Sequence, residues 1–341
     1  MSANGYQFAL EFFTDKGSVA QVSVTPDWQP ALESARFAGI RRGVLPPVAA
    51  GPGTIEPIWD GEVGAPYVAG IRALIPDSWA WDIPNAYFRG EARNAAARLL
   101  EQKIIQAGDT ASYLVYAFAK DEPLSRDDAD GLEVERVLEP LPLVDAPLER
   151  FLGRAVQNGD GHDDDMPVFI PQHVLDETVA LARRTPDVET GGILIGMLHR
   201  DANRPEVFLE VTAQIPAEHA RAERAKITFT AETWAAAQAA IDLRHKQETM
   251  LAWWHYHPDF CRNCPPENQE RCALRSVFFS AEDVHLHRVC FAQPWAVALL
   301  LSDTSSADLA VSLFGWRQGM VAARGFHVMR GDYADAQTAI G

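Results

Sequence analysis

Two histidines, His255 and His257, stand two residues apart near the end of an apolar and aromatic segment. Residues 250–257 predict a buried strand, which the proline that follows would end. Alternate side chains of a strand point to opposite faces, so both imidazoles would share one face, and Trp254 and Tyr256 would face a core on the other. Two imidazoles on one face can bind one metal ion. A His-x-His pair by itself is equally compatible with two ordinary histidines.

A carboxylate that could complete such a site occurs in the segment Ser280-Ala281-Glu282-Asp283. Residues 281–289 predict a helix with Ser280 as its N-cap, which places Asp283 in the first turn. Ligation by His255, His257 and Asp283 would leave one tetrahedral position for water, as in catalytic zinc sites. Zinc lowers the pKa of such a water toward neutrality. Taken alone, Ser280 is an ordinary helix cap, and a second role is compatible with capping.

Hydrolysis also needs a base that takes a proton from water and passes it to the leaving amine. Glu189 is the candidate, because it directly precedes an apolar strand expected at 191–198. The adjacent pair Gly191-Gly192 would allow another backbone to approach closely. A single glutamate is ordinarily a solvated carboxylate. Only its occurrence together with His255, His257 and Asp283 favours a role as the base.

In this order, Glu189, His255-Tyr256-His257-Pro258 and Ser280-Ala281-Glu282-Asp283 resemble the JAMM motif of the MPN+ metalloproteases, also called JAB domains. The resemblance implies that His255, His257 and Asp283 bind a catalytic zinc ion. It implies that Glu189 is the general base and that Ser280 stabilises the oxyanion.

The resemblance covers residues 166–328, about half of the chain. It implies a cytidine-deaminase-like MPN/JAMM sandwich in this half. It also implies a zinc isopeptidase that cuts after the C-terminal glycine of ubiquitin or a ubiquitin-like protein.

A cysteine cluster enlarges the gap between the histidine and serine motifs. Cys261, Cys264 and Cys272 have the spacing of a structural zinc site, and the expected reducing compartment favours metal over disulfides. The natural fourth ligand is His285, because in the AMSH-like branch a histidine at this offset helps bind a second zinc. His287 is the substitute, and three unrelated thiols are the alternative. The fourth cysteine, Cys290, is expected in the core.

The composition narrows the class of protein. The chain has 341 residues, enough for two domains, and 47% of them are hydrophobic, as in folded proteins. Its net charge of -17 disfavours nucleic acid and anionic membranes, which require Lys and Arg contacts. The first residues do not resemble a signal peptide, and no apolar stretch has the length of a membrane span. We therefore expect a soluble cytoplasmic protein.

The order of elements predicts an α/β (α+β) chain in separate parts. Residues 1–155 are expected to form an α+β domain for substrate or partner binding, with strands at 6–13, 19–24 and 113–119, a helix at 90–106 and a loop at 45–66. Residues 156–165 predict a Gly/Asp linker, since the pattern of a calcium-binding EF-hand is absent.

Residues 166–330 are expected to form the catalytic domain, and 331–341 a tail. Its expected elements are helices at 171–184 and 231–244 and strands at 191–198, 207–215, 296–301, 309–315 and 320–328, besides the strand and helix of the motifs.

Three functions are compatible with these residues. The first is an isopeptidase that deconjugates or matures a ubiquitin-like protein. The high alanine content suggests a prokaryotic source, and the resemblance then points to the deconjugases of bacterial antiviral operons of the Bil type, with conjugating and activating enzymes as further partners. The second is a peptidase that trims a sulfur-carrier protein or a small peptide. The third is a non-catalytic MPN scaffold, which would lack the ligands found here.

Overall fold

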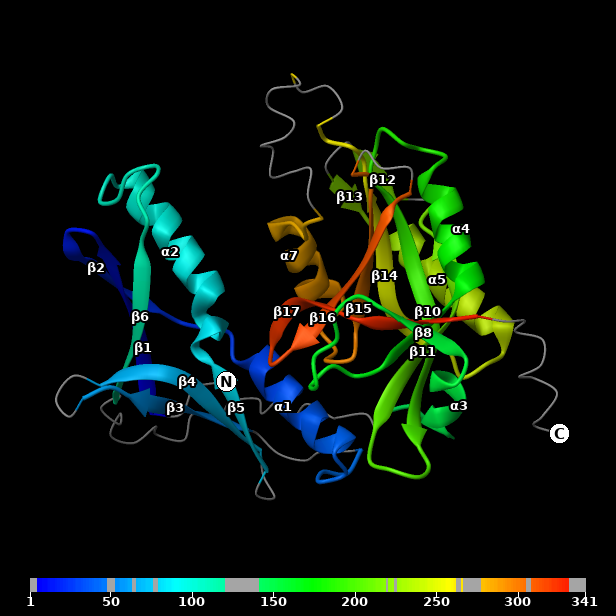
Figure 1. Ribbon diagram of the computed structural model, residues 1–341, viewed down its shortest axis with the longest axis horizontal. Coiled ribbons are helices and arrows are strands. Elements are labelled where there is room, and N and C mark those ends of the chain that lie inside the picture. Colours follow the sequence, from blue (N-terminus) through cyan, green and yellow to red (C-terminus); the bar gives the residue numbers. More distant parts are fainter. Residues whose placement is uncertain are drawn as a thin grey trace, which may run out of the picture. The chain divides into compact units, whose positions relative to one another are not determined.

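The chain folds into two units. The structure is a computed structural model and describes residues 5–47, 53–62, 66–75, 79–119, 141–218, 220–223, 226–261, 265, 277–304 and 308–330. Unit 1 comprises residues 1–140 with 318–320, and unit 2 comprises 141–317 with 321–341. Strands outnumber helices in both units, which confirms the mixed α+β class (Figure 1). None of the described helices is long and apolar enough to cross a membrane.

Unit 1 contains two antiparallel sheets of three strands, in the orders β2-β1-β6 and β3-β4-β5. Its strands are β1 (Tyr6–Thr14), β2 (Gly17–Val24), β3 (Thr54–Asp60), β4 (Tyr67–Ile75), β5 (Trp79–Pro84) and β6 (Ser112–Ala119). Its helices are α1 (Gln29–Arg41), the 3-10 helix η1 (Asn85–Phe88) and α2 (Arg89–Glu101). Side chains from both sheets and both α-helices form one core, which includes the fully buried Leu10 and Phe88.

The prediction of a loop at 45–66 is wrong in part, because residues 54–60 form β3 and pair with β4. This strand contains Pro57, and proline donates no ladder hydrogen bond. It is tolerated here because β3 is an edge strand of its sheet. The helix expected at 90–106 ends earlier, at Glu101, and Lys103 follows with a positive φ of 59°.

Unit 2 is built on a large mixed sheet in the order β17-β16-β15-β14-β10-β11-β9-β18-β8, with β7 paired to β10. These strands are β7 (Leu143–Ala146), β8 (Ala155–Asn158), β9 (Val168–Pro171), β10 (Thr190–Asp201), β11 (Val207–Pro216), β14 (Thr249–His257), β15 (Val297–Ser302), β16 (Ala310–Arg317), β17 (Met320–Arg324) and β18 (Phe326–Met329). The strands β12 (Arg221–Glu223) and β13 (Lys226–Thr228) form a separate hairpin. The helices are α3 (Leu148–Leu152), α4 (Gln172–Ala182), α5 (Ala231–Arg244) and α7 (Ala281–Cys290).

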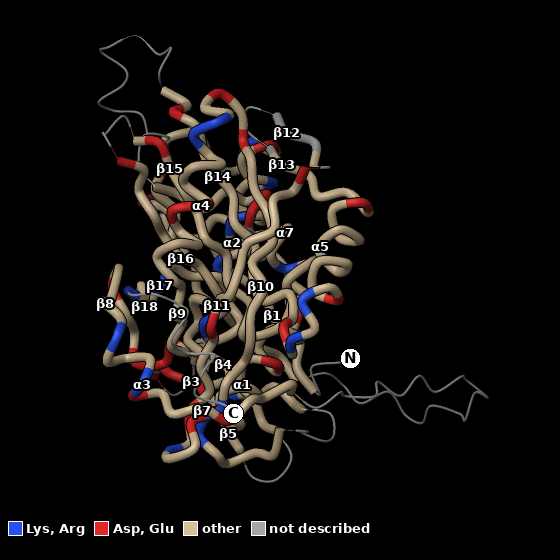
Figure 2. The backbone as a smooth tube through the Cα atoms, turned by 90° about the vertical axis from the view of Figure 1, so that its right-hand side faces the viewer, with Lys and Arg blue, Asp and Glu red and all other residues tan. Residues whose placement is uncertain are grey.

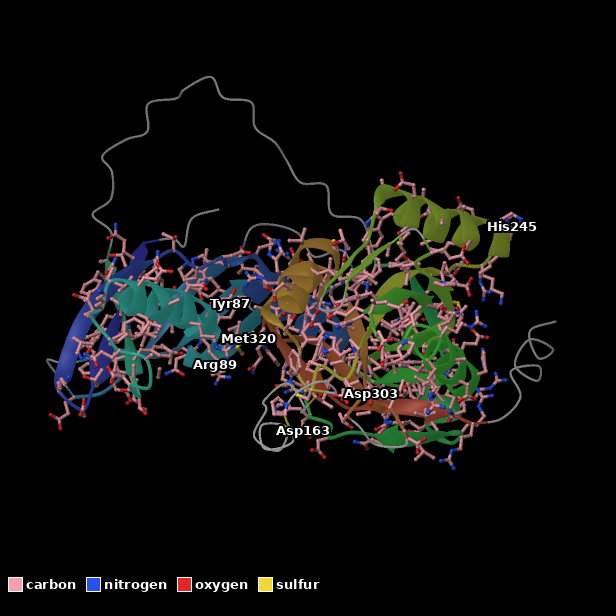
Figure 3. The ribbon with its side chains drawn as sticks, turned by 90° about the horizontal axis from the view of Figure 1, so that it is seen from above. Tyr87, Arg89, Asp163, His245, Asp303 and Met320 are labelled. Atoms are coloured by element: carbon pink, nitrogen blue, oxygen red, sulfur yellow. The ribbon has the colours of Figure 1, made fainter. Side chains whose placement is uncertain are left out.

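Helices pack on the middle of this sheet. Ile193 and Trp253 lie in one core cluster with side chains of α5 and with Phe291, which follows α7. The neighbouring side chain of Tyr256 points to the opposite face and donates a hydrogen bond to the carbonyl of Pro186, just beyond α4. The two central strands β14 and β15 carry no Asp, Glu, Lys or Arg, so they appear uncharged in Figure 2. Figure 3 labels His245, whose left-handed conformation ends α5.

The segment expected to be a linker, 156–165, differs from that expectation at both of its ends. Residues 155–158 form β8, which pairs with β18 in the large sheet. At the other end, Asp165 binds Arg317 through two hydrogen bonds of 2.9 and 2.7 Å. A short polar strand at a sheet edge has no apolar period, so its pairing cannot be predicted from residue types alone.

Candidate metal centre

The two histidines of the sequence motif lie on β14, near the middle of the large sheet. β14 pairs with β10 on one side and with β15 on the other, which fixes its backbone. His255 and His257 share one face and are 0% and 3% exposed, and their Nε2 atoms lie 3.1 Å apart. Trp254 and Tyr256 are buried on the other face, as the alternation predicted.

The carboxylate comes from the first turn of α7. Ser280 caps this helix through a capping box: its Oγ accepts a hydrogen bond from the Asp283 amide at 3.0 Å, and its own amide donates to Asp283 Oδ2 at 2.7 Å. The backbone and one carboxylate oxygen of Asp283 are therefore held in place before any metal binds. The other oxygen, Oδ1, lies 3.3 Å from Nε2 of His255, and Oδ2 lies 3.5 Å from Nε2 of His257.

These three side chains have the donor set and spacing of a metal site. All of their ligand atoms lie within 4.8 Å of one another, and all three residues are buried. Tetrahedral zinc with ligands at 2.0–2.2 Å separates neighbouring ligand atoms by about 3.3–3.5 Å, close to the distances found here. The His255-His257-Asp283 group therefore fits a small divalent ion, and two imidazoles with one carboxylate are a donor set that zinc accepts.

The protonation states also suit metal binding. Burial lowers the pKa of the His255 imidazole, despite the opposing effect of Asp283, so the ring is neutral and can ligate. Burial alone would raise the pKa of Asp283, but hydrogen bonds from His255 and His257 outweigh it and hold that pKa well below its usual range. His255 thus offers a neutral imidazole, and Asp283 offers an anionic carboxylate.

Glu189 lies beside this group, immediately before β10. The register that pairs Gly191 with His255 carries Glu189 to the metal-facing end of β14, and its Oε1 lies 3.7 Å from Nε2 of His257. A Cβ atom on Gly191 or Gly192 would come within 2.4 Å of the Trp254 carbonyl or 2.3 Å of the Ile215 carbonyl. The glycine pair thus permits the close strand packing that was expected of it.

The environment of Glu189 is unusual for a carboxylate. Its side chain is only 4% exposed. Burial first, and the charge of Asp283 second, raise its pKa to about 8, although a hydrogen bond with the backbone of Ile227 acts in the opposite direction. A carboxylate with a raised pKa beside a candidate metal site can accept and release a proton near neutral pH.

The expected second zinc site lies mostly outside the described residues, because Cys264 and Cys272 are not among them. Cys261 is 2% exposed and follows β14. His285 is exposed and does not belong to the His255-His257-Asp283 group.

His287, the substitute ligand, lies in the core of unit 2. It is fully buried, and its Nδ1 accepts a hydrogen bond of 3.1 Å from the indole N–H of Trp253. Burial lowers its pKa to about 3. The sequence could not show this contact, because it depends on how α7 packs on β14.

The prediction that Cys290 lies in the core is wrong, because this cysteine is exposed at the end of α7. A helix that packs on a sheet exposes part of its circumference, and Cys290 falls at the edge of a cavity rather than beneath the helix.

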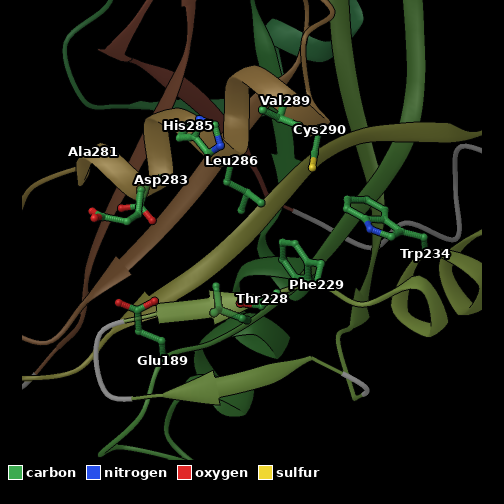
Figure 4. Close-up of a pocket in the computed structure, with 12 residues that line it drawn as sticks. Glu189, Thr228, Phe229, Trp234, Ala281, Asp283, His285, Leu286, Val289 and Cys290 are labelled. Atoms are coloured by element: carbon green, nitrogen blue, oxygen red, sulfur yellow. The ribbon is translucent and has the colours of Figure 1, made fainter. Parts of the chain in front are cut away.

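That cavity, of about 510 Å³, begins at the candidate metal centre and continues along α7. Glu189 and Asp283 lie at one end, and Trp234 and Cys290 lie at the other (Figure 4). The remaining lining residues are Ile227, Thr228, Phe229, Ala281, Glu282, His285, Leu286 and Val289. An apolar hollow that ends at buried carboxylates has the character of a substrate site.

No protein-family model matches the chain, and no curated protein does either. Among solved structures, the solution structure of protein DSY2949 from Desulfitobacterium hafniense is similar, with a TM-score of 0.35 and 18% identity. The match covers 49% of this chain and 96% of that one. A likeness of this size carries no conclusion about this chain.

Proposed function

We propose that this chain is a zinc-dependent peptidase of the JAMM type, and that it cuts the bond after the C-terminal glycine of ubiquitin or a ubiquitin-like protein. One observation carries the proposal: the buried carboxylate of Glu189 lies 3.7 Å from Nε2 of His257, which with His255 and Asp283 forms a candidate metal site. A structural metal site would need no proton acceptor at this place.

Each residue has a role in the proposed reaction. A zinc ion held by His255, His257 and Asp283 supplies a Lewis acid that acidifies water and polarises the scissile carbonyl. Glu189 accepts the proton of the attacking water and delivers it to the nitrogen of the leaving amine. Its burial beside Nε2 of His257 favours this transfer, because it holds the carboxylate next to the place where the water would bind.

Ser280 is proposed to stabilise the oxyanion. Its Oγ already accepts a hydrogen bond from the Asp283 amide, so its hydroxyl proton can be donated elsewhere. A donor held by a helix cap is oriented before the substrate arrives, which is the condition for this kind of stabilisation.

The cavity supports an extended substrate. Ile227 and Thr228 of β13 line it, together with apolar side chains of α7. An extended tail could therefore lie beside this hairpin with its side chains against the apolar wall and its terminal glycine at the metal centre. The narrower proposal, deconjugation in a bacterial antiviral system, rests on the motif resemblance alone.

The experiment is a cleavage assay on ubiquitin and ubiquitin-like proteins that carry a C-terminal extension. We expect the zinc-loaded protein to release the extension, with mass spectrometry placing the cut after the terminal glycine. A chelator should abolish cleavage, and added zinc should restore it. Zinc binding without cleavage of any such fusion would contradict the proposed substrate, and a protein that binds no zinc would contradict the proposed chemistry.

A further inference from the structure

The ring of Trp253 lies flat against the candidate ligand His255. Trp253 precedes His255 by two residues on β14, so the two side chains share one face of the sheet. Their ring centroids are 4.5 Å apart with an angle of 14° between the planes, and both residues are 0% exposed. One flat face of the imidazole is therefore covered by a buried indole.

The indole is itself held from the helix that carries the third candidate ligand. Trp253 Nε1 donates to Nδ1 of His287 at 3.1 Å, and His287 lies one helical turn after Asp283 on α7. Phe291 stacks on both partners, at 6.2 Å and 19° from Trp253 and at 6.1 Å and 17° from His287. The contact thus joins the strand of His255 and His257 to the helix of Asp283.

Histidines that bind metals are usually oriented by a hydrogen bond at their second ring nitrogen. Neither His255 Nδ1 nor His257 Nδ1 has a hydrogen-bond partner among the described residues. The χ2 angle of histidine has a broad energy minimum, so the strand alone does not fix the ring plane of His255. Stacking on the indole of Trp253, which is itself held in place, does fix that ring plane.

We infer that Trp253 and His287 are positioning residues that hold the imidazole of His255 in its metal-binding orientation. The inference rests on the proposed function in so far as it takes the His255-His257-Asp283 group to be a metal site. His287 acts only through Trp253, as the acceptor that keeps the indole in the plane that His255 needs.

The adjacent tryptophan provides a matched control. Trp254 is also 0% exposed on β14, but it points to the opposite face. Its Nε1 has no hydrogen-bond partner within the described part of the chain. Trp253→Phe and Trp254→Phe therefore remove the same group from neighbouring buried positions, and only the first change touches the site.

The test measures Zn²⁺ affinity by competition with a chelator and records the visible spectrum of the Co²⁺-loaded full chain. We expect Trp253→Phe and His287→Phe each to weaken metal binding by roughly tenfold and to alter the Co²⁺ bands, as do other changes to groups that orient metal ligands. The double variant should lose little more than either single one, because both act through one contact. Trp254→Phe should bind as the wild type does.

Two further variants separate positioning from general packing. His287→Asn places an amide oxygen near the position of Nδ1 and should therefore bind zinc almost as tightly as the wild type does. If His287→Phe does not fold, Trp253→Phe and His287→Asn together still test the inference. His327→Phe removes another histidine of unit 2, stacked on Phe169 with ring centroids 4.9 Å apart, and should leave metal binding unchanged.

Unchanged affinity and spectrum in both Trp253→Phe and His287→Phe would overturn the inference and leave the proposed function intact. Equal losses in Trp254→Phe would also overturn it, because they would reflect packing alone. A wild-type protein that binds no metal would contradict the proposed function itself.

Discussion

The carboxylate of Glu189 lies 3.7 Å from Nε2 of His257, although one residue precedes β10 and the other ends β14. Antiparallel pairing of Gly191 with His255 produces this proximity. A shift of one residue in that register would turn both histidines to the opposite face of the sheet. The position of the proposed base is thus a property of strand register.

Asp283→Asn should strongly weaken metal binding without unfolding α7. Asparagine retains an oxygen that can accept the Ser280 amide, so the capping box survives, but the only anionic ligand of the group is lost. We expect zinc affinity to fall by at least about 100-fold, beyond the usual effect of changes around the ligands. Isothermal titration would measure it, and Glu282→Gln, on the exposed neighbour, is the control.

Glu189→Gln should stabilise the metal-free protein at alkaline pH. The folded pKa of Glu189, about 8, lies above the ordinary glutamate value of about 4.5, so the folded protein binds this proton more tightly. That contribution is fully present below about pH 4.5 and is lost as the pH rises through 8. Urea unfolding at pH 9 should therefore show the variant to be more stable than the wild type by several kcal/mol, because each unit of pKa difference corresponds to about 1.4 kcal/mol.

The stability advantage of Glu189→Gln should disappear in urea unfolding at pH 4, where Glu189 of the wild type is mostly protonated in the folded and in the unfolded state. An equal difference in stability at the two pH values would mean that Glu189 does not titrate as its burial indicates.

Ser280→Ala separates capping from catalysis when it is compared with Thr230→Ala. Thr230 caps α5 by accepting from the Thr233 amide, so either variant should lose about 1 kcal/mol of unfolding free energy. Only Ser280→Ala should also lower kcat, because its hydroxyl faces the proposed reaction. Equal kcat values in the two variants would leave Ser280 with the capping role alone.

Filling the cavity should weaken substrate binding and leave the chemistry intact. Cys290→Trp adds an indole at the end of the cavity away from Glu189 and should raise KM for an extended substrate with little change in kcat. Ala239→Trp adds the same group to an exposed position of α5 outside the cavity and should not change KM. A lower kcat at unchanged KM would argue against substrate binding there.

Much of the candidate site follows from local sequence. The period of two puts His255 and His257 on one face, and Ser280 at the start of the expected helix identifies the cap beside Asp283. The buried faces of Trp254 and Tyr256 follow from the same alternation. These features need only neighbours in the chain, so one sequence suffices to predict them.

Features that depend on packing between distant segments were missed. Strand β3 was missed because the stretch 45–66 is rich in Gly and Pro, which predicts a loop unless a strand is known to lie at a sheet edge. The contact of Trp253 with His287 and the exposure of Cys290 both depend on how α7 turns on the sheet. No periodicity in one sequence determines that rotation.

The most direct test compares zinc-loaded wild type and zinc-loaded Glu189→Gln in single-turnover cleavage of a ubiquitin-like fusion. The account predicts equal zinc content and a rate that falls by about 10²- to 10⁴-fold, the usual effect of removing a general base. Glu177→Gln, an exposed change on α4, should cleave at the wild-type rate. A Glu189→Gln protein that holds zinc and cleaves as fast as the wild type would contradict the account.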